Sequence, residues 1–438
     1  MILEMAETDW LASKNIFYNT RTNQISDNIN DLIDVNHIEF HPEGLCNYLD
    51  YGYSVFGQTP IKEIKVLPAN CKIAKDPKGK ICIVMKEDLF EKSMGDSSTP
   101  EDTLEYIHYL VNEWEKQSQG KTILPLSGGF DSRLLASMIE NKKEVKAYTY
   151  GITEKQNESM EVVYAKKLSE ILGISWKQIE IGEFHNLFEQ WNQMYGISTH
   201  AHGMYQMEFY SKIKSDISQG RILSGIYGDL WAGSWKFEEI LNPKQLINLA
   251  ITHEMTADSN FCKIKGQREL RNLFFEENKE KLKEQNWRIL LAARMKIILI
   301  SYLLRVPEYY GFDVWSPFLD FTAVSKMLNL SWDIKERRKW QIEYFRDKNI
   351  LIGELGLPCD KGNCLNQMAV WRIQPKPLDV KLLGSVMNET YVEQINANLD
   401  YKYIEKKRYY HAYLVLYPIQ KILELKEYGM TGIKTTEG

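Results

Sequence analysis

Residues 124–133 read Leu-Pro-Leu-Ser-Gly-Gly-Phe-Asp-Ser-Arg, and this stretch decides the fold. Its apolar lead-in, residues 121–126, predicts a buried strand, and a helical run is expected from residue 132 to residue 140. Glycines between a strand and a helix allow positive φ angles and a close approach of the backbone to a ligand. The first amide groups of a helix lack internal partners and, with the helix dipole, favour an anion. The stretch therefore predicts an anion-binding loop.

The same stretch carries side chains suited to a nucleotide and its metal ion. Asp131 offers a carboxylate of the kind that binds Mg²⁺ together with phosphate oxygens, and two serine hydroxyls can donate to phosphate. The lysine of a P-loop is missing, so the loop differs from a Walker-type site. A plain turn is the alternative, because serine, glycine and aspartate are common in turns. The predicted nucleotide-binding residues of this stretch are Leu126, Ser127, Gly128, Gly129, Asp131 and Ser132.

Strands and helices alternate after this loop. A strand is expected over residues 145–151, a helix from residue 158 to residue 172 that is closed by Gly173, and a further strand over residues 174–181. Alternation at this spacing predicts an α/β fold with a doubly wound parallel sheet, followed by a helical C-terminal part. Ligands in such sheets bind beyond the carboxyl ends of the strands, which is where the loop is expected.

A second segment repeats the pattern of the first. Residues 222–233 read Ile-Leu-Ser-Gly-Ile-Tyr-Gly-Asp-Leu-Trp-Ala-Gly, an apolar run followed by small residues and an aspartate. An ordinary loop is the alternative for this segment taken alone. Two aspartates on separate loops could hold a cation together with phosphate oxygens and so neutralise phosphate charge. The segment therefore predicts the second half of one site, with Gly225 and Asp229 among its members.

The composition is ordinary for a globular enzyme. Apolar residues make up 44% and charged residues 26% of the 438 residues, and the net charge of −5 gives no electrostatic footprint for nucleic acid. Six cysteines are scattered along the chain, so free thiols are expected. The most apolar segment, residues 289–306, is interrupted by Arg294, Lys296 and Arg305 and predicts a core helix. We expect a cytoplasmic protein that binds neither nucleic acid nor membrane.

The first part of the chain is expected to be β-rich, with one helix over residues 42–51. Asp-Pro-Lys-Gly at residues 76–79 is typical of a hairpin turn. Thr99 suits the N-cap of the helix that begins the next part of the chain. The sequence therefore predicts two domains, residues 1–95 and residues 96–438. The strands expected in the first are residues 15–19, 61–67, 72–74 and 81–85.

The order of these motifs resembles that of the asparagine synthetase family, a branch of the ATP pyrophosphatase superfamily. The likeness rests on four segments: residues 127–132, Glu161-x-x-Tyr164-Ala165, residues 224–233, and Pro-Phe-Leu-Asp at 317–320. The resemblance implies an ATP-dependent ligase that adenylates a carboxylate, releases pyrophosphate and lets an amine attack the acyl-adenylate. It further implies ATP and Mg²⁺ as cofactors. Asp131 and Asp229 would hold the metal, and adenine would lie near Tyr150 at a strand end.

Residues 41–52 and 59–70 resemble the last third of the glutaminase domain of asparagine synthetases. The full glutaminase is about twice as long and has a nucleophilic cysteine directly after the initiator methionine. Here Ile2 stands at that place, and Cys46 falls inside a predicted helix. A nucleophile of that kind needs its own α-amine as base, so we expect a truncated glutaminase-like domain without glutamine hydrolysis. Nitrogen would come from ammonia, a separate glutaminase partner or a substrate amine.

The catalytic residues are predicted from the same resemblance. At Ile226, asparagine synthetases carry a glutamate and β-lactam synthetase a tyrosine, and isoleucine can do no acid–base chemistry. Tyr227 or Glu308 is therefore predicted as an alternative base. A lysine is expected to stabilise the developing pyrophosphate and the intermediate, and Lys361 is the predicted one, with Lys376 as the fallback.

Four further residues have open roles. Asp320 is expected either to contact substrate or to cap a helix that begins at a proline. Arg133 follows the loop serine and would be a cation near the phosphates or part of an ion pair behind them. His200 and His202 form a His-x-His pair that could bind a metal, or line a pocket or cap a helix.

Two functions of different classes remain. The first is an amide-forming ligase that acts on a small-molecule or peptide carboxylate and on ammonia or an amine. The second is a degenerate relative that keeps the ATP site as a scaffold or partner subunit, with Ile226 as one sign of lost catalysis. The two aspartates and two serines of the predicted site favour the ligase.

Overall fold

The computed structural model describes residues 5–93, 95–117, 120–250, 252–399 and 406–431. Its centre is a five-stranded parallel sheet in the order β10-β9-β6-β7-β8. The strands are β6 (Thr122–Pro125), β7 (Val145–Thr149), β8 (Ser175–Gln178), β9 (Arg221–Leu223) and β10 (Asp313–Trp315). This sheet confirms the predicted α/β class.

The strand order reverses between β6 and β9. From β6 the chain moves outward through β7 to β8, then returns to place β9 on the other side of β6. Thr122 of β6 is therefore in register with both Val145 of β7 and Arg221 of β9. Ligands in open α/β sheets bind at such a reversal, beyond the carboxyl ends of the strands. Both loops predicted to form the site leave the sheet here, one from each of the two central strands.

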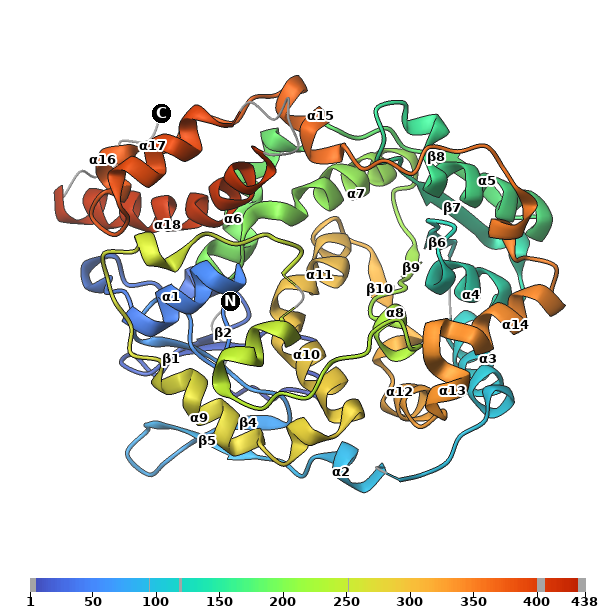
Figure 1. Ribbon diagram of the computed structural model, residues 1–438, viewed down its shortest axis with the longest axis horizontal. Coiled ribbons are helices and arrows are strands. Elements are labelled where there is room, and N and C mark those ends of the chain that lie inside the picture. Colours follow the sequence, from blue (N-terminus) through green and yellow to red (C-terminus); the bar gives the residue numbers. More distant parts are fainter. Residues whose placement is uncertain (1–4, 94, 118–119, 251, 400–405, 432–438) are drawn as a thin grey trace.

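Helices lie on both sides of the sheet (Figure 1). On one side α4 (Phe130–Met138) packs against α3 (Pro100–Lys116) and α5 (Met160–Leu172). On the other side α7 (Met204–Asp216) packs against α11 (Tyr302–Tyr309). The sheet is thus covered on both faces, which leaves its edge at the carboxyl ends of the strands for ligands.

Helix ends follow the predicted capping signals. The hydroxyl of Thr99 accepts a hydrogen bond from the Asp102 amide at 3.1 Å and caps α3. Gly173 closes α5 with a left-handed φ of +68°. The predicted core helix over 289–306 is two consecutive helices, α10 (Gln285–Ile300) and α11.

Among the remaining helices, the long α18 lies beside α16 and α17, and α14 lies beside α4 (Figure 1). No helix in the described ranges is long and apolar enough to cross a membrane. Their bounds are α1 (Pro42–Tyr51), α2 (Leu89–Ser93), α6 (Phe188–Tyr195), α8 (Gly228–Trp231), α9 (Glu269–Asn278), α12 (Phe321–Leu328), α13 (Trp332–Lys335), α14 (Lys339–Asp347), α15 (Leu365–Arg372), α16 (Val380–Leu383), α17 (Glu389–Ala397) and α18 (Lys407–Thr431).

The N-terminal part contains an antiparallel sheet in the order β2-β1-β3 and a separate β4–β5 hairpin. The Asp-Pro-Lys-Gly turn lies between β4 and β5, where Gly79 donates to the Asp76 carbonyl at 2.8 Å. Only β2 was not predicted, because two residues are too short to show alternation. The strands are β1 (Phe17–Asn19), β2 (Ile25–Ser26), β3 (Ile64–Val66), β4 (Cys71–Lys75) and β5 (Ile81–Met85).

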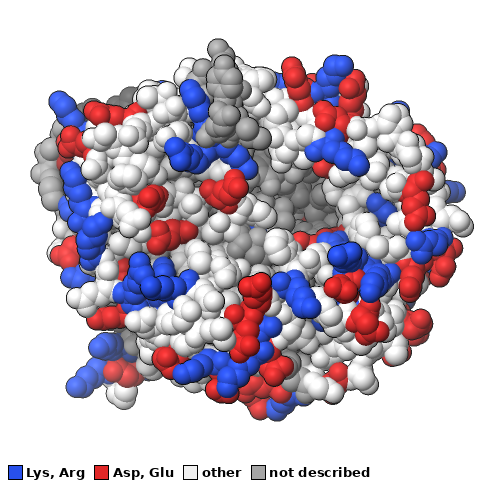
Figure 2. All heavy atoms as spheres, in the orientation of Figure 1, with Lys and Arg blue, Asp and Glu red and all other residues white. Residues whose placement is uncertain are grey.

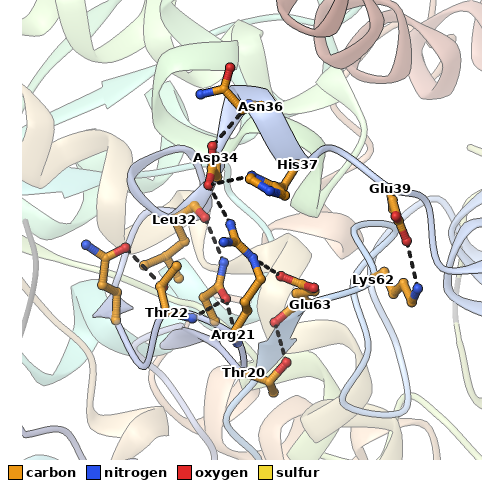
Figure 3. Close-up of polar contacts among 12 residues, drawn as sticks. Thr20, Arg21, Thr22, Leu32, Asp34, Asn36, His37, Glu39, Lys62 and Glu63 are labelled. Carbon is orange, nitrogen blue, oxygen red and sulfur yellow. Dashed lines mark hydrogen bonds and ion pairs between the residues drawn. The ribbon is translucent and has the colours of Figure 1, made fainter.

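A surface ion-pair network ties the segments of this part together (Figure 3). The guanidinium of Arg21 lies 2.5 Å from the Asp34 carboxylate and 2.6 Å from that of Glu63. The side-chain amide of Asn19 donates to the Leu32 carbonyl at 3.1 Å. Because the charged groups are about one-third exposed, we assign them a role in fixing loop positions rather than a large stabilisation.

The N-terminal part also shares a hydrophobic core with the rest of the chain. Arg294 of α10 donates to the carbonyl of Trp10 at 2.7 Å and pairs with Asp88 at 2.6 Å. The Gly52 carbonyl accepts from the His200 amide at 2.9 Å. The division at residue 95 stays a prediction, and its two sides are in direct contact.

Candidate active site

The first loop connects β6 to α4. The amide of Leu126 donates to the Tyr148 carbonyl at 2.9 Å and extends the pairing of β6 with β7. Gly128 has a φ of +67° and lies against α5, where an added Cβ would be 2.4 Å from the Cβ of Tyr164. Both the left-handed φ and this close approach require glycine. The loop is thus fixed between the sheet and α5.

Two hydroxyls and the start of α4 converge in this loop. The hydroxyl oxygens of Ser127 and Ser132 lie 3.2 Å apart, and the Ser127 amide donates to the Ser132 hydroxyl at 3.2 Å. α4 begins after Gly129, and no described side chain caps its first turn. Unpaired amides at a helix start, beside two hydroxyls, are the donors that a phosphate group needs.

Arg133 lies beneath the loop rather than beside the phosphate position. Its side chain is 2% exposed, and one guanidinium nitrogen donates to the Gly128 carbonyl at 2.6 Å. The guanidinium also packs over the rings of Phe130 and Phe345, at 5.2 and 5.0 Å from their centres. Burial lowers the pKa of Arg133 to about 10. Arg133 forms no ion pair with a described carboxylate and supports the loop backbone from behind, and its role near the phosphates stays a prediction.

The second loop connects β9 to α8 and meets the first at Asp131. An added Cβ at Gly228 would lie 2.6 Å from the carboxyl carbon of Asp131, and one at Gly225 would lie 3.4 Å from its Cβ. The backbone amide of Asp229 hydrogen-bonds to the Asp131 carboxylate. The indole of Trp235 donates to the Asp229 carboxylate at 3.2 Å. The structure therefore brings together the two predicted metal-binding aspartates, 98 residues apart in sequence.

Arg338 is a member of the site that the sequence did not indicate. Its guanidinium lies 3.1 Å from the Asp131 carboxylate and also donates to the Ser234 hydroxyl. Arg337 and Arg338 have left-handed φ angles of +55° and +58°, which are uncommon for residues other than glycine. Strained backbone of this kind clusters at functional sites. The one sequence signal was the pair of arginines itself, and surface arginines are too common to single it out.

Contact between the two loops changes the ionisation of Asp131. Burial raises its pKa to about 7, although 21% of the side chain is exposed. The Arg338 guanidinium opposes this rise, whereas the Asp229 carboxylate adds to it. Two crowded carboxylates are held at lower free energy when a cation lies between them.

The donor set fits Mg²⁺ bound together with a phosphate chain. Mg²⁺ in nucleotide sites uses one or two carboxylates and takes its other ligands from phosphate and water. Asp131 and Asp229 offer two such carboxylates beside the amides and hydroxyls of the first loop. The described residues contain no group of three or more His, Cys, Asp or Glu side chains placed to hold a metal.

Tyr150 lies at the carboxyl end of β7, as predicted for a residue near adenine. Its hydroxyl accepts from the Gln206 amide at 3.0 Å, and its ring packs edge-on against Tyr205 and Phe209. Burial raises the pKa of Tyr150 well above the usual range of a phenol, so it stays neutral. An aromatic wall therefore runs from the strand end towards α7.

Tyr227 and Ile226 both point into the core. The Tyr227 hydroxyl donates to the Ala293 carbonyl of α10 at 2.8 Å, and burial raises its pKa well above the usual range. Ile226 is 1% exposed. The structure does not bring the Tyr227 hydroxyl to the two loops, because the left-handed φ of +63° at this residue turns its side chain towards α10.

Glu308 and Asp320 line a second cavity, of about 340 Å³, beside β10. The cavity walls partly desolvate Glu308 and raise its pKa, while Lys14 and Arg305 lower it. Asp320 accepts from the Ala323 amide at 2.9 Å and caps α12. Asp320 therefore caps α12, while its contact with substrate and the role of Glu308 as a base stay predictions.

Lys361 lies on a segment that runs beside the start of α5. The Asp360 amide donates to the Glu158 carbonyl at 2.8 Å, and the Asp360 carbonyl accepts from the Met160 amide at 2.8 Å. This pairing places the Lys361 backbone at the carboxyl end of the sheet, with its side chain exposed. Lys376 lies beyond α15, where its carbonyl accepts from Tyr413 of α18 at 3.0 Å. Lys361 is thus the better placed of the two lysines.

His200 and His202 have the pocket and capping roles. The Nδ1 atom of His200 accepts from the His202 amide at 3.2 Å, and both side chains line a cavity next to α7 and α10. Their ring centres are 6.0 Å apart. All six cysteines are free thiols, as expected.

Comparison with known proteins places the site within a family. The family model described as asparagine synthase matches residues 117–348, a stretch that contains both loops and Arg338. Among solved structures, the chain is similar to the NH3-dependent NAD synthetase from Campylobacter jejuni subsp. jejuni NCTC 11168 in complex with the nitrate ion. That similarity is 17% identity over 46% of this chain and 96% of that chain, with a TM-score of 0.27. No curated protein matches the chain.

Proposed function

Because the chain belongs to the asparagine synthase family, we propose that it adenylates a substrate carboxylate with ATP and transfers the acyl group to ammonia or an amine. In general terms, family membership makes the protein an ATP-dependent, amide-forming ligase. The finer statement concerns the order of events. Attack of the carboxylate on the α-phosphate releases pyrophosphate, and attack of the amine on the acyl-adenylate then releases AMP.

One observation carries this proposal: the meeting of the two loops at Asp131. The loop after β6 and the loop after β9 converge at the reversal of strand order, and Gly228 permits contact with the Asp131 side chain. Where the loops meet, two serine hydroxyls and two carboxylates lie within a few residues of one another along the two loops. Such a site holds a polyphosphate and its cation, because each needs the charge that the other supplies.

The residues of the site then have distinct roles in the first step. The amides of the first loop and the hydroxyls of Ser127 and Ser132 would bind the leaving pyrophosphate. Asp131 and Asp229 would hold Mg²⁺, which supplies charge neutralisation when bound. Arg338 would move from Asp131 towards the phosphate oxygens, and its fixed positive charge would stabilise the developing negative charge there.

The second step needs a base for the amine and a cation for the tetrahedral intermediate. Glu308 is the proposed base, because burial beside β10 raises the pKa of its carboxyl and so favours uptake of a proton. Lys361 is the proposed cation. Its segment pairs with the start of α5, and Asn363, two residues further on, lines the cavity next to α7 and α10. The nitrogen would be ammonia, a substrate amine or ammonia from a separate glutaminase. Cys46 lies within α1 and donates to the Ile264 carbonyl at 3.4 Å, so it has no α-amine of its own to act as a base, which supports a nitrogen source outside this part of the chain.

The test identifies the phosphorus products with carboxylic acids supplied singly, with and without ammonia. We expect acid-dependent formation of pyrophosphate and AMP, and transfer of a labelled carboxylate oxygen to AMP. Asp131→Asn should abolish both, whereas Asp102→Asn on the exposed start of α3 should leave both unchanged. Formation of ADP and phosphate would contradict the proposal. Tight ATP binding without either product would favour the scaffold alternative.

A further inference from the structure

A cavity of about 580 Å³ lies beside the proposed nucleotide site. Figure 2 shows a hollow near the middle of this face of the molecule, with acidic and basic side chains mixed around it. The volume of the cavity lies within the range of about 300–1,000 Å³ typical of small-molecule sites. The residues that line it are His200, His202, Tyr205, Thr252, His253, Glu254, Met255, Lys296, Leu299, Ile300, Tyr302, Asn363, Cys364, Asn366, Gln367 and Lys407.

Lys296 is a buried cation that faces this cavity. It lies on α10, is 7% exposed, and its ammonium group is 2.9 Å from the Nε2 atom of His253. None of the described carboxylates forms an ion pair with it. Burial lowers the pKa of Lys296 to about 8, and the nearby carboxylate of Asp229 opposes that shift. A buried charge without a counter-charge is costly, so an anion in the cavity would be bound favourably.

His200 offers a second donor to the same space. Because its Nδ1 atom accepts from the His202 amide, the neutral ring carries its proton on Nε2. The ring stays neutral, since burial and the neighbouring His202, His411, Lys296 and His253 all lower its pKa. His200 is 1% exposed, and its Nε2 atom has no partner within the described ranges. A buried N–H group without an acceptor costs free energy that a bound oxygen would recover.

The rest of the wall is aromatic, apolar or amide-bearing. Tyr205 and Tyr302 join through their hydroxyls at 3.0 Å, and Leu299 and Ile300 add apolar surface. Within the lining the one carboxylate is Glu254, which pairs with Lys407 at 3.0 Å. The described lining therefore offers donors for a carboxylate but no unpaired carboxylate for a substrate ammonium group.

We propose that this cavity binds the acyl substrate, and that the substrate is an N-acylated amino acid or a peptide, with its carboxylate held by Lys296 and His200. This inference rests on the proposed adenylation. A carboxylate has room for both donors and keeps lone pairs for attack on phosphorus. Asp229 connects the two sites, because its charge acts on both Asp131 and Lys296. The aromatic and amide wall then surrounds the acyl body of the substrate.

Ligand binding tests the class of substrate. A panel of N-acetyl amino acids is compared with the corresponding free amino acids and N-acetyl amino acid amides by saturation-transfer NMR and calorimetry. For at least one side chain we expect the N-acetyl acid to bind about tenfold more tightly than its two counterparts, since only the acid has the carboxylate without the ammonium group. Tighter binding of free amino acids, or no binding by any N-acetyl acid, would overturn the proposal.

Lys296 is then tested directly. Lys296→Met should weaken binding of the selected acid by about tenfold or more and leave ATP affinity within about twofold. The control is Lys283→Met, which replaces an exposed lysine just before α10 and should change neither affinity. In the unaltered protein, the acid should protect Lys296 from acetic anhydride as read by mass spectrometry, which keeps the test valid if the variant does not fold. Equal labelling with and without acid would overturn the assignment. Loss of pyrophosphate formation with intact protection would refute the adenylation alone.

Discussion

The guanidinium of Arg338 lies 3.1 Å from the carboxylate of Asp131. The two residues are 207 positions apart and meet at the start of α4, where the phosphate chain is proposed to bind. Arg338 thus provides the positive charge that Asp131 needs while no other cation is present. From this position the Arg338 side chain can move from Asp131 to the phosphate oxygens of a bound nucleotide.

Loss of this arginine should therefore slow the first step. We expect Arg338→Gln to lower kcat/KM for pyrophosphate release by about ten- to a hundredfold, because hydrogen bonds to charged groups contribute about 1.5–3 kcal/mol. Arg338→Lys should recover part of the loss. Arg337→Gln is the matched control, since it changes the exposed neighbour in the same strained turn. An Arg338→Gln rate equal to that of the control would rule out the role.

Magnesium binding should depend on pH. The pKa of Asp131 is raised to about 7, and Mg²⁺ binds the ionised carboxylate, so affinity should fall as pH decreases below about 7. Binding near neutral pH should then release protons, which calorimetry in two buffers of different ionisation enthalpy measures. In Asp131→Asn the proton release should disappear. An affinity that is constant from about pH 6 to about pH 8 would contradict this assignment.

The carboxyl group of Asp131 should also make folding stability depend on pH. Stability should fall as pH rises, whereas Mg²⁺ affinity should increase. The folded-state pKa of Asp131 exceeds the ordinary value of 3.8, so the metal-free protein binds the extra proton between these two values. The stabilisation that this bound proton gives is fully present below pH 3.8 and is lost as pH rises through about 7. The free energy of unfolding of the unaltered protein, relative to Asp131→Asn, should therefore decrease over this interval in urea titrations without metal. A difference that increased with pH would contradict it.

Two glycines with nearly equal φ angles, Gly128 and Gly173, allow the effect of backbone strain to be separated from the effect of a side-chain contact. Gly128 has φ +67° and touches α5, whereas Gly173 has φ +68° and open space around it. Alanine at either should cost about 1 kcal/mol of unfolding free energy for its left-handed conformation. Only Gly128→Ala should also weaken ATP binding, by about tenfold or more, because the loop must move away from Tyr164. Equal ATP affinities in the two variants would show that the contact is unimportant.

The N-terminal part should unfold together with the sheet. Arg294 of α10 is 15% exposed and holds both the Trp10 carbonyl and the Asp88 carboxylate. Arg294→Met should lower the free energy of unfolding by about 1–3 kcal/mol, because it leaves the mostly buried Asp88 carboxylate without its hydrogen-bond donor. A single cooperative transition is expected for both proteins by circular dichroism and tryptophan fluorescence. Two separate transitions would show that the parts are independent.

The sequence predicted the fold and the two loops well because their signals are local. A strand, a glycine-containing turn and a helix start are contiguous in residues 121–140, and so is the segment that ends at Asp229. Helix ends with Thr99 and Gly173 were also predictable, since caps act within a few residues. Local patterns of this kind are fixed by backbone chemistry rather than by distant contacts.

The parts that the sequence did not reveal depend on long-range packing. Arg338 reaches Asp131 only through the strained turn before α14, and nothing near either residue indicates the other. Tyr227 lies in the right segment, but its backbone turns the phenol towards Ala293. In the sequence Lys296 only interrupts an apolar helix, whereas in the folded protein α10 places it in the cavity lining. Side-chain direction at such positions is set by the tertiary fold.

The central claim is that a carboxylate attacks the α-phosphate of ATP where the two loops meet at Asp131. The most direct measurement is exchange of radiolabelled pyrophosphate into ATP in the presence of a carboxylic acid and in the absence of any amine. We predict exchange that requires both the acid and Mg²⁺ and that is lost in Asp131→Asn. Bound ATP with no acid-dependent exchange, for any acid that binds the cavity, would contradict the account.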